Sequence, residues 1–169
     1  MRKTAIRIIT TGGTIDSSEN YDPEKKSVFA GYGTNLPKML EQSRTKDRFV
    51  MDALMLKDSA DINDSDRNLV LEHIQNAPED RIVILHGTSA MADTARFLGP
   101  NIKNKTVVLV GSITPYTQKW SDALFNLGYA IATAKVLPNG VYVAMNGKTF
   151  NWDNVKKNTD SGVFENMRS

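Results

Sequence analysis

The sequence contains no cysteine and only two histidines among its 169 residues. The lack of cysteine excludes disulfide bonds, a thiol nucleophile and a thiolate metal site, and it is compatible with a reducing cytoplasm, where we expect the protein. Two histidines, His73 and His86, are too few for a histidine-rich metal cluster, and no HExxH motif occurs. We therefore expect no metal site.

The chain also lacks a long apolar run and an excess of charge of one sign. Lys and Arg number 21 against 19 Asp and Glu, and these charges are spread along the chain, so we expect no nucleic-acid partner. No segment approaches the roughly 20 apolar residues that cross a bilayer, so we expect no membrane partner. The length and composition predict a single globular domain over residues 1–169.

Short β-rich runs alternate with segments of helical periodicity along the whole chain. The expected strands are 5–10, 49–56, 82–85, 107–110 and 141–145, with a hairpin to 148–150, and the expected helices are 35–42, 63 or 64 to 77, 91–98 and 121–134. This alternation predicts an α/β fold, a three-layer α/β/α structure with a mostly parallel, Rossmann- or flavodoxin-like sheet and right-handed crossovers.

Glycine and hydroxyl residues follow three of these strands, in the segments Thr10–Ile15, His86–Ser89 and Gly111–Pro115. Ligands of parallel sheets bind beyond the carboxyl ends of the strands. Each segment alone indicates a tight turn with a helix cap, but three at one edge favour a pocket for a small anionic or carbonyl-bearing ligand. Neither a GxGxxG motif nor a Walker loop occurs, which disfavours nucleotide binding.

The residues alone leave the chemistry of this pocket open. A threonine hydroxyl is a weak nucleophile unless a base or a charged group activates it. No Ser-His-Asp set is visible, and His86 is better explained as a structural residue inside a turn. The activating group could be a lysine, a tyrosine or a carboxylate from elsewhere in the chain.

Six motifs, in this order, resemble the bacterial-type L-asparaginase/glutaminase family. They are Thr11–Ile15 (TGGTI), Asp58–Asp61 (DSAD), His86–Thr88 (HGT), Val107–Gly111 (VVLVG), Ser121–Leu127 (SDALFNL) and Asn154–Lys157 (NVKK). The resemblance covers the larger N-terminal domain of the family and not its smaller C-terminal domain. It implies a short-chain, single-domain member, with residues 150–165 as its natural finish.

The resemblance implies four catalytic residues and no cofactor. Thr14, the second threonine of TGGTI, corresponds to the nucleophile that attacks the side-chain amide, and Thr88 to a second catalytic threonine. Lys157 corresponds to the lysine of a Thr-Lys-Asp relay, with Lys156 as the alternative. Tyr21, or Tyr32 in its place, corresponds to a tyrosine on the loop after the first strand that activates or covers the nucleophile.

The resemblance also implies the substrate and its contacts. The substrate is asparagine or a related small amide, and Ser59 corresponds to the serine that binds its α-carboxylate. The remaining substrate-binding positions are Gly13, Gly87, Asp58 and Ser89, and the Gly-rich turns would supply backbone N–H groups to the oxyanion. Because long-chain relatives close their sites with a neighbouring subunit, we expect a homodimer or a larger homo-oligomer, with exposed apolar residues such as Trp120, Phe125 or Trp152 supplying the contact.

One departure from the family pattern affects activity. The family reads HGTD where this chain has Ser89, and that aspartate pairs with the substrate ammonium and the relay lysine. A hydroxyl there removes a charge-assisted hydrogen bond, which costs about 1.5–3 kcal/mol. Asp93, one helical turn further on, is the nearest substitute, and full compensation by it is not expected. The sequence therefore predicts an amidohydrolase of reduced or altered activity, with a non-catalytic small-carboxylate-binding module as the alternative.

Overall fold

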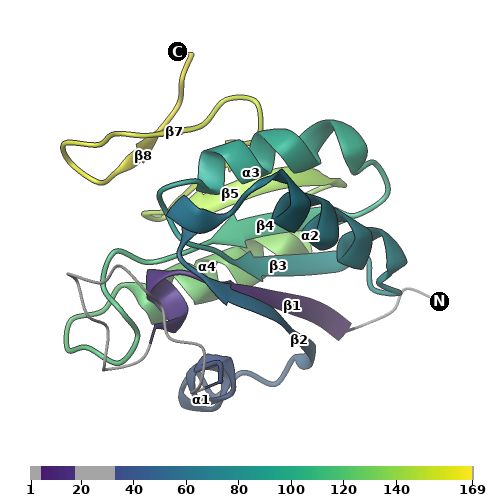
Figure 1. The fold of residues 1–169 in the computed structure, drawn as a ribbon. Helices are drawn as coiled ribbons and strands as arrows, with labels where there is room; N and C mark the ends of the chain where they lie inside the picture. The colour runs from purple at the N-terminus through teal and green to yellow at the C-terminus, as the bar shows by residue number, and fades with distance from the viewer. Residues whose placement is uncertain (1–4, 18–32, 169) are drawn as a thin grey trace.

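The computed structural model describes residues 5–17 and 33–168. Six strands form one sheet in the order β2-β1-β3-β4-β5-β6 (Figure 1). They are β1 (Ala5–Gly12), β2 (Arg48–Lys57), β3 (Arg81–Leu85), β4 (Thr106–Val110), β5 (Gly140–Met145) and β6 (Lys148–Asn151). The first five run parallel and β6 is antiparallel to β5. The predicted mostly parallel α/β sheet is confirmed.

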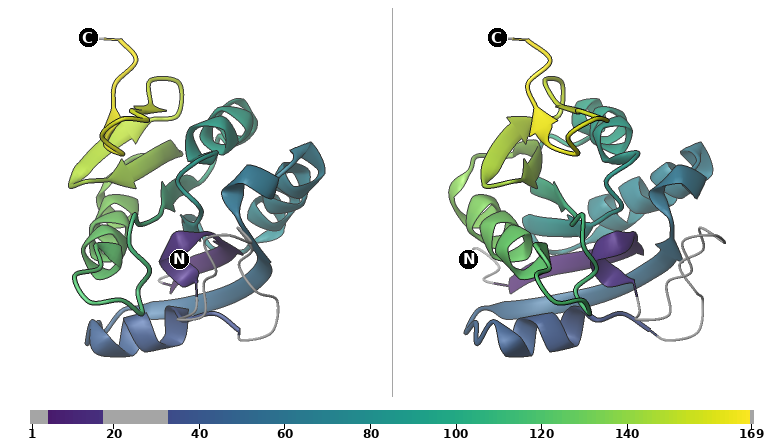
Figure 2. Two further views of the ribbon diagram at one scale, coloured as in Figure 1. Left: turned by 60° about the vertical axis from the view of Figure 1, so that its left-hand side comes forward. Right: turned by 90° about the vertical axis from the view of Figure 1, so that its left-hand side faces the viewer.

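Helices cover both faces of this sheet. They are α1 (Leu36–Gln42), α2 (Asp64–Asn76), α3 (Met91–Leu98) and α4 (Ala123–Val136), with single 3₁₀ turns η1 (Thr14–Asp16), η2 (Ser59–Asp61) and η3 (Gly99–Asn101). α2 and α3 lie on one face, α4 lies on the other, and α1 lies beside the edge strand β2 (Figures 1 and 2). The predicted three layers are therefore present. None of the helices in the described part of the chain is long and apolar enough to cross a membrane.

The hands of the crossovers differ from the prediction. The chain moves in the same direction along the sheet from β3 to β4 and from β4 to β5. Because α3 and α4 cover opposite faces (Figure 2), these two crossovers have opposite hands. The expectation that every crossover is right-handed is therefore wrong for one of them, and packing of α4 on its face of the sheet overrides the usual preference.

The central strands fix the edge of the sheet that carries the loops of interest. The apolar runs 82–85 and 107–110 are fully buried, which matches a parallel sheet with helices on both faces. Moving either strand would expose a continuous apolar segment, and each such side chain stabilises the fold by about 1.5–3 kcal/mol when buried. The loops that follow β3 and β4 therefore start from rigid positions.

Side-chain hydrogen bonds mark the starts of two helices, as a cap at α2 and as a contact with the preceding loop at α4. Asn63, not Asp64, is the N-cap of α2, because the Asp66 N–H donates to Asn63 Oδ1 and the Asn63 N–H donates to Asp66 Oδ2, each at 3.1 Å. α4 begins at Ala123, two residues later than predicted. The Asp122 carboxylate instead accepts the backbone N–H groups of residues 113 and 114, which ties the loop after β4 to the helix.

The C-terminal tail forms a second, small sheet that the sequence analysis did not predict. β7 (Lys156–Lys157) pairs antiparallel with β8 (Phe164–Glu165), beyond the carboxyl edge of the main sheet (Figure 1). Val155 and Phe164 are buried in the core, and the Phe164 N–H donates to Asn146 Oδ1 at 3.0 Å. These contacts dock the tail next to the hairpin between β5 and β6.

Trp152 was expected to be an exposed residue available for subunit contact, and this expectation is wrong. Its indole packs over Gly99, where an added Cβ would lie only 2.1 Å from the ring, and the side chain adjoins the core. Trp120 and Phe125, the other two expected contact residues, are exposed at 87% and 62%.

Candidate active site

A cavity of about 220 Å³ lies at the carboxyl ends of β1, β3 and β4. It is lined by Gly13, Thr14, Asp58, Ser59, Gly87, Thr88, Ser89, Ser112, Ile113 and Lys157. Eight of the nine site residues expected from the sequence are therefore brought together. The ninth, Tyr21, and its alternative Tyr32 lie outside the described residues.

Two glycines bring the threonines into the same cavity. Gly13 has a φ of +80°, which disfavours side chains other than hydrogen, and a Cβ on it would lie 2.3 Å from the backbone nitrogen of Gly87. The loops after β1 and β3 are thus in direct backbone contact. Because Thr14 and Thr88 each follow one of these glycines, the close approach places both threonines on the cavity wall.

Lys157 reaches this wall from the tail. Its Nζ donates a hydrogen bond of 2.9 Å to Thr88 Oγ1, and Thr88 is 8% exposed. Successive side chains of a strand point to opposite sides, so the neighbouring lysine of β7 is directed elsewhere. Lys156 forms an ion pair of 3.2 Å with Glu165 and does not line the cavity.

Ser59 is tied to the loop that carries Thr88. It is buried, and its Oγ accepts the backbone N–H groups of Ser89 at 3.1 Å and Ala90 at 3.3 Å. A hydroxyl has two acceptor positions and one proton, so Ser59 can still donate its proton to a ligand oxygen. Asp58 caps η2 by accepting the N–H of Ala60 at 2.9 Å.

His86 has the structural role that the sequence predicted. It is buried beneath the cavity and bonds Gly87 O through Nδ1 at 2.7 Å and Thr94 Oγ1 through Nε2 at 3.0 Å. Burial lowers the pKa of His86 to about 4, with a smaller contribution from the positive charge of Arg67. The imidazole is therefore neutral at pH 7 and does not supply a positive charge to the site.

The site carries few charges. Asp58 and Lys157 are the only charged side chains among the described residues that line it. Asp93 does not line the cavity; its carboxylate is largely exposed and lies 3.8 Å from Arg96 Nη2. Nothing at position 93 therefore replaces the carboxylate that Ser89 lacks. Within residues 5–17 and 33–168, no group of three or more His, Asp or Glu side chains could hold a metal ion.

Sequence reasoning did not assign two of the lining residues, Ser112 and Ile113. Both belong to the Gly- and hydroxyl-rich segment after β4, which was the available signal. Ser112 is buried and its Oγ donates to Thr114 O at 2.7 Å, while Ile113 is 48% exposed at the cavity mouth. Nothing in the motif alone distinguished them from ordinary turn residues.

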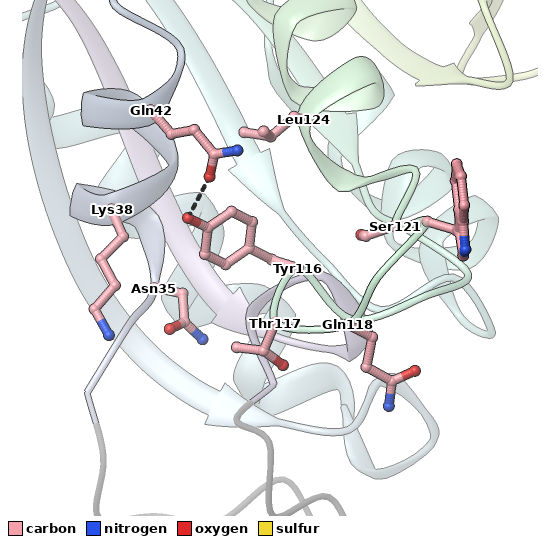
Figure 3. A pocket seen from close by; sticks show the side chains of 9 residues that line it. Asn35, Lys38, Gln42, Tyr116, Thr117, Gln118, Ser121 and Leu124 are labelled. Carbon is pink, nitrogen blue, oxygen red and sulfur yellow. Dashed lines mark hydrogen bonds between the residues drawn. The ribbon is translucent and has the colours of Figure 1, made fainter.

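A larger cavity of about 470 Å³ lies between α1 and the loop after β4 (Figure 3). Tyr116 crosses it and donates its hydroxyl proton to Gln42 Oε1 at 2.7 Å. Among the described residues that line it, Lys38 is the only charged one. It therefore lacks the paired polar groups on which acid–base chemistry depends, and we place the candidate site at the carboxyl edge of β1, β3 and β4.

Known proteins resemble this chain over nearly its whole length. Residues 5–167 match the family described as "Asparaginase, N-terminal". L-asparaginase 2 of Escherichia coli is 34% identical over 96% of this chain and 49% of that protein. A probable periplasmic L-asparaginase of Haemophilus influenzae is 32% identical over 94% of this chain and 47% of its own length.

Solved structures agree with these relatives. The thermostable L-asparaginase of Thermococcus kodakarensis superposes with a TM-score of 0.82 at 26% identity, over 98% of this chain and 52% of that one. A probable cytoplasmic L-asparaginase of Campylobacter jejuni gives a TM-score of 0.82 at 28% identity, over 98% of this chain and 54% of its own. The chain spans about half the length of the relatives it matches, and it belongs to the asparaginase family, whose N-terminal domain it matches.

Proposed function

We propose that this protein hydrolyses the side-chain amide of asparagine, or of a related small amide, to the acid and ammonia. The observation that carries the proposal is the 2.9 Å hydrogen bond from Lys157 to Thr88, on the wall of a cavity that Thr14 shares. Two hydroxyls and a lysine around one small cavity are suited to nucleophilic attack with proton transfer. Membership of the asparaginase family supports the same chemistry.

We assign the first half of the reaction to Thr14. Its oxygen bonds to the amide carbon, its proton passes to a base, and the carbonyl oxygen becomes an oxyanion. We expect backbone N–H groups of Thr14 and Thr88, which line the cavity, to stabilise that charge, since the Gly13 N–H is already donated to Lys57 O at 2.9 Å. When the tetrahedral intermediate collapses, the C–N bond breaks. The leaving nitrogen takes up the proton that Thr14 gave to the base, and ammonia is released. Tyr21 is our candidate for activating Thr14.

We assign the second half to the pair formed by Thr88 and Lys157. A water molecule held by this pair attacks the acyl-threonine ester, the acid leaves, and Thr14 recovers its proton. The remaining hydroxyl proton of Ser59 is free to bind a carboxylate of the substrate, since both acceptor positions already hold backbone N–H groups. The mechanism uses no cofactor.

The test is ammonia release from asparagine, glutamine and succinamate, by the unmodified protein and by Thr14→Val. Valine keeps the shape of threonine without its hydroxyl, so we expect turnover to fall at least about 10³-fold while the melting temperature stays within a few degrees. Equal turnover by the folded Thr14→Val variant would contradict the assignment of the nucleophile.

A binding module that does not turn over its ligand is the second candidate, and Ser89 favours it. Among the described residues, no carboxylate lies within 4.0 Å of Lys157 Nζ, so the lysine lacks an ion-pair partner. This candidate predicts that small carboxylates raise the melting temperature while no amide releases ammonia. That pair of results would replace the hydrolase proposal.

We further propose a cytoplasmic homodimer or larger homo-oligomer. Trp120 and Phe125 expose large apolar surfaces, and aromatic residues are enriched in protein–protein contacts. A second subunit over the cavity would exclude water and strengthen the electrostatic interactions inside it. Sedimentation should show a dimer or larger species that Trp120→Glu weakens; a monomer at high concentration would contradict this proposal. That residues 1–169 act as a single domain stays a prediction.

A further inference from the structure

A second cavity, of about 340 Å³, adjoins the candidate active site. It is lined by Ser89, Ala92, Asp93, Arg96, Lys156, Lys157 and Thr159. Ser89 and Lys157 line both cavities, so these two side chains form the boundary between them. The position where the family carries an aspartate therefore lies on the wall that the two cavities share.

The second cavity is basic. Of the described lining residues, Arg96, Lys156 and Lys157 contribute three positive charges, and Asp93 contributes the only carboxylate. Asp93 compensates little, because it is 66% exposed and its oxygen lies 3.8 Å from the guanidinium. Glu165 pairs with Lys156 at 3.2 Å from outside the lining, which still leaves an excess of positive charge.

Arg96 is also incompletely satisfied. Its Nη1 is buried without a hydrogen-bond partner in the described part of the chain, so this atom is not itself open to the cavity, whereas the Arg96 side chain as a whole is 38% exposed and lines it. A buried N–H group without a partner is costly, and a guanidinium favours carboxylates because its N–H groups can bind both oxygens. The wall beyond Ser89 thus has the chemistry of an anion site rather than an ammonium site.

We propose that the preferred substrate is an asparagine-like amide whose α-nitrogen carries an acidic acyl group. This inference rests on the proposed hydrolase function and names its substrate class. The side-chain amide lies at Thr14, and the acyl carboxylate reaches past Ser89 toward Arg96 and Lys156. Acylation removes the ammonium charge, which would otherwise face a hydroxyl at position 89 and the cations beyond it. The 340 Å³ cavity has room for a short acyl chain.

Asp58 is the one feature of the site that favours a free ammonium group. Within the described part of the chain it is the only carboxylate that lines the active-site cavity, but one of its oxygens already caps η2 through the N–H of Ala60. The experiment must therefore separate an anionic arm at Arg96 from an ammonium group at Asp58.

The experiment compares kcat/KM for ammonia release from N-succinyl-L-asparagine, N-acetyl-L-asparagine and L-asparagine. We expect the succinyl compound to exceed the acetyl compound at least about tenfold, and this advantage to shrink as ionic strength rises. Arg96→Gln should bring the succinyl value down toward the acetyl value. Lys148→Gln, which removes an exposed charge on β6, should keep the tenfold preference and serves as the matched control.

Ser89→Asp should reverse the preference. An added carboxylate beside Lys157 and Arg96 repels the succinyl arm and attracts an ammonium, so asparagine turnover should rise at least about tenfold. Ser89→Asn is the control, because asparagine is nearly equal in size to aspartate but carries no charge. Position 89 immediately precedes the N-cap Ala90 of α3, where a negative charge suits the helix N-terminus.

Two results would overturn the inference in distinguishable ways. If the unmodified protein prefers free asparagine and Asp58→Asn abolishes that preference, Asp58 binds an ammonium group and the substrate class is wrong while the hydrolase remains. If none of these amides, glutamine or succinamate releases ammonia from the folded protein, the proposed function fails and this inference fails with it.

Discussion

The candidate site has two walls that are built differently. Thr14 and Thr88 follow strands of the six-stranded sheet, whose central strands are fully buried. Lys157 lies on β7, a two-residue strand that pairs with β8 in a two-stranded sheet. We call these the sheet wall and the tail wall. Backbone packing between Gly13 and Gly87 sets the geometry of the first, and side-chain docking sets that of the second.

The difference between the two walls shows which part of the candidate site is rigid and which part can open. The threonines cannot separate unless β1 and β3 move, and those strands carry the core. The tail wall is held by few contacts, chiefly the buried side chains of Val155 and Phe164 and the hydrogen bond to Asn146. Segments with few buried contacts open at a lower free energy than the global unfolding free energy. The lysine is therefore the member of the site most easily lost.

We expect the largest effect on stability from Gly13→Ala, which disrupts the backbone contact of the sheet wall. The new Cβ would meet the Gly87 backbone at 2.3 Å and would also sit at a φ of +80°, so we expect the free energy of unfolding to fall by about 2–6 kcal/mol. Gly33→Ala is the matched control, because Gly33 has a φ of +67° and no atom of the described residues lies within 4 Å of its added Cβ. Gly33→Ala should lower the free energy of unfolding by about 1 kcal/mol. Equal losses in urea unfolding would refute the backbone-contact account.

Phe164→Ala should produce the next largest effect, and should confine it to the tail wall. Removing a fully buried phenylalanine costs about 3–5 kcal/mol where the structure cannot relax, but undocking of the tail caps the loss here. We expect about 3 kcal/mol or less, with amides of β7 and β8 exchanging much faster while those of β3 and β4 stay protected. Uniform acceleration across both sheets would show that the walls are one cooperative unit.

Two buried ionisable groups near the sheet wall, Asp16 and His86, should change the stability with pH in opposite directions. Burial raises the pKa of Asp16 to about 6, against the hydrogen bonds it accepts from Thr34 and Asn35. The folded state then holds this proton more tightly than the unfolded chain, so stability falls as pH rises from about 4 to 6. Burial lowers the pKa of His86 to about 4, so stability rises as pH rises from about 4 to 6.5.

These two contributions, each roughly 3 kcal/mol at most, oppose each other between pH 4 and 6. We expect a shallow net dependence in the unmodified protein. Asp16→Asn removes the contribution that falls as pH rises, so the free energy of unfolding should increase from pH 4 to pH 6. Urea unfolding at several pH values measures this change. A profile unchanged by Asp16→Asn would show that Asp16 titrates normally.

Much of the fold followed from local signals in the sequence. The apolar runs at 82–85 and 107–110 predicted buried parallel strands, and residues such as Asn63 marked helix starts. The opposite hand of one crossover could not be predicted, since it depends on which face α4 covers. The exposure of Trp152 was mispredicted because Gly99, which accommodates its ring, is distant in sequence.

The grouping of residues in the candidate site was predictable where those residues belong to sequence-local motifs. Thr14, Thr88 and the glycines beside them are such cases. The double role of Ser59 was not, because its bonds to the Ser89 and Ala90 backbone join residues about 30 positions apart. The basic cavity beyond Ser89 was also invisible, since α3 and β7 come together only in the folded chain.

The most direct test of the account uses the lack of cysteine. Lys157→Cys introduces a unique thiol, which 2-bromoethylamine converts into a close analogue of lysine. We predict that ammonia release from the best amide substrate falls at least about 100-fold in Lys157→Cys and recovers at least about tenfold after aminoethylation, but not after neutral alkylation with iodoacetamide. Lys148→Cys, treated in the same ways, should keep its activity throughout. Full activity in Lys157→Cys, or equal recovery with the neutral reagent, would contradict the claim that the tail supplies the catalytic ammonium group.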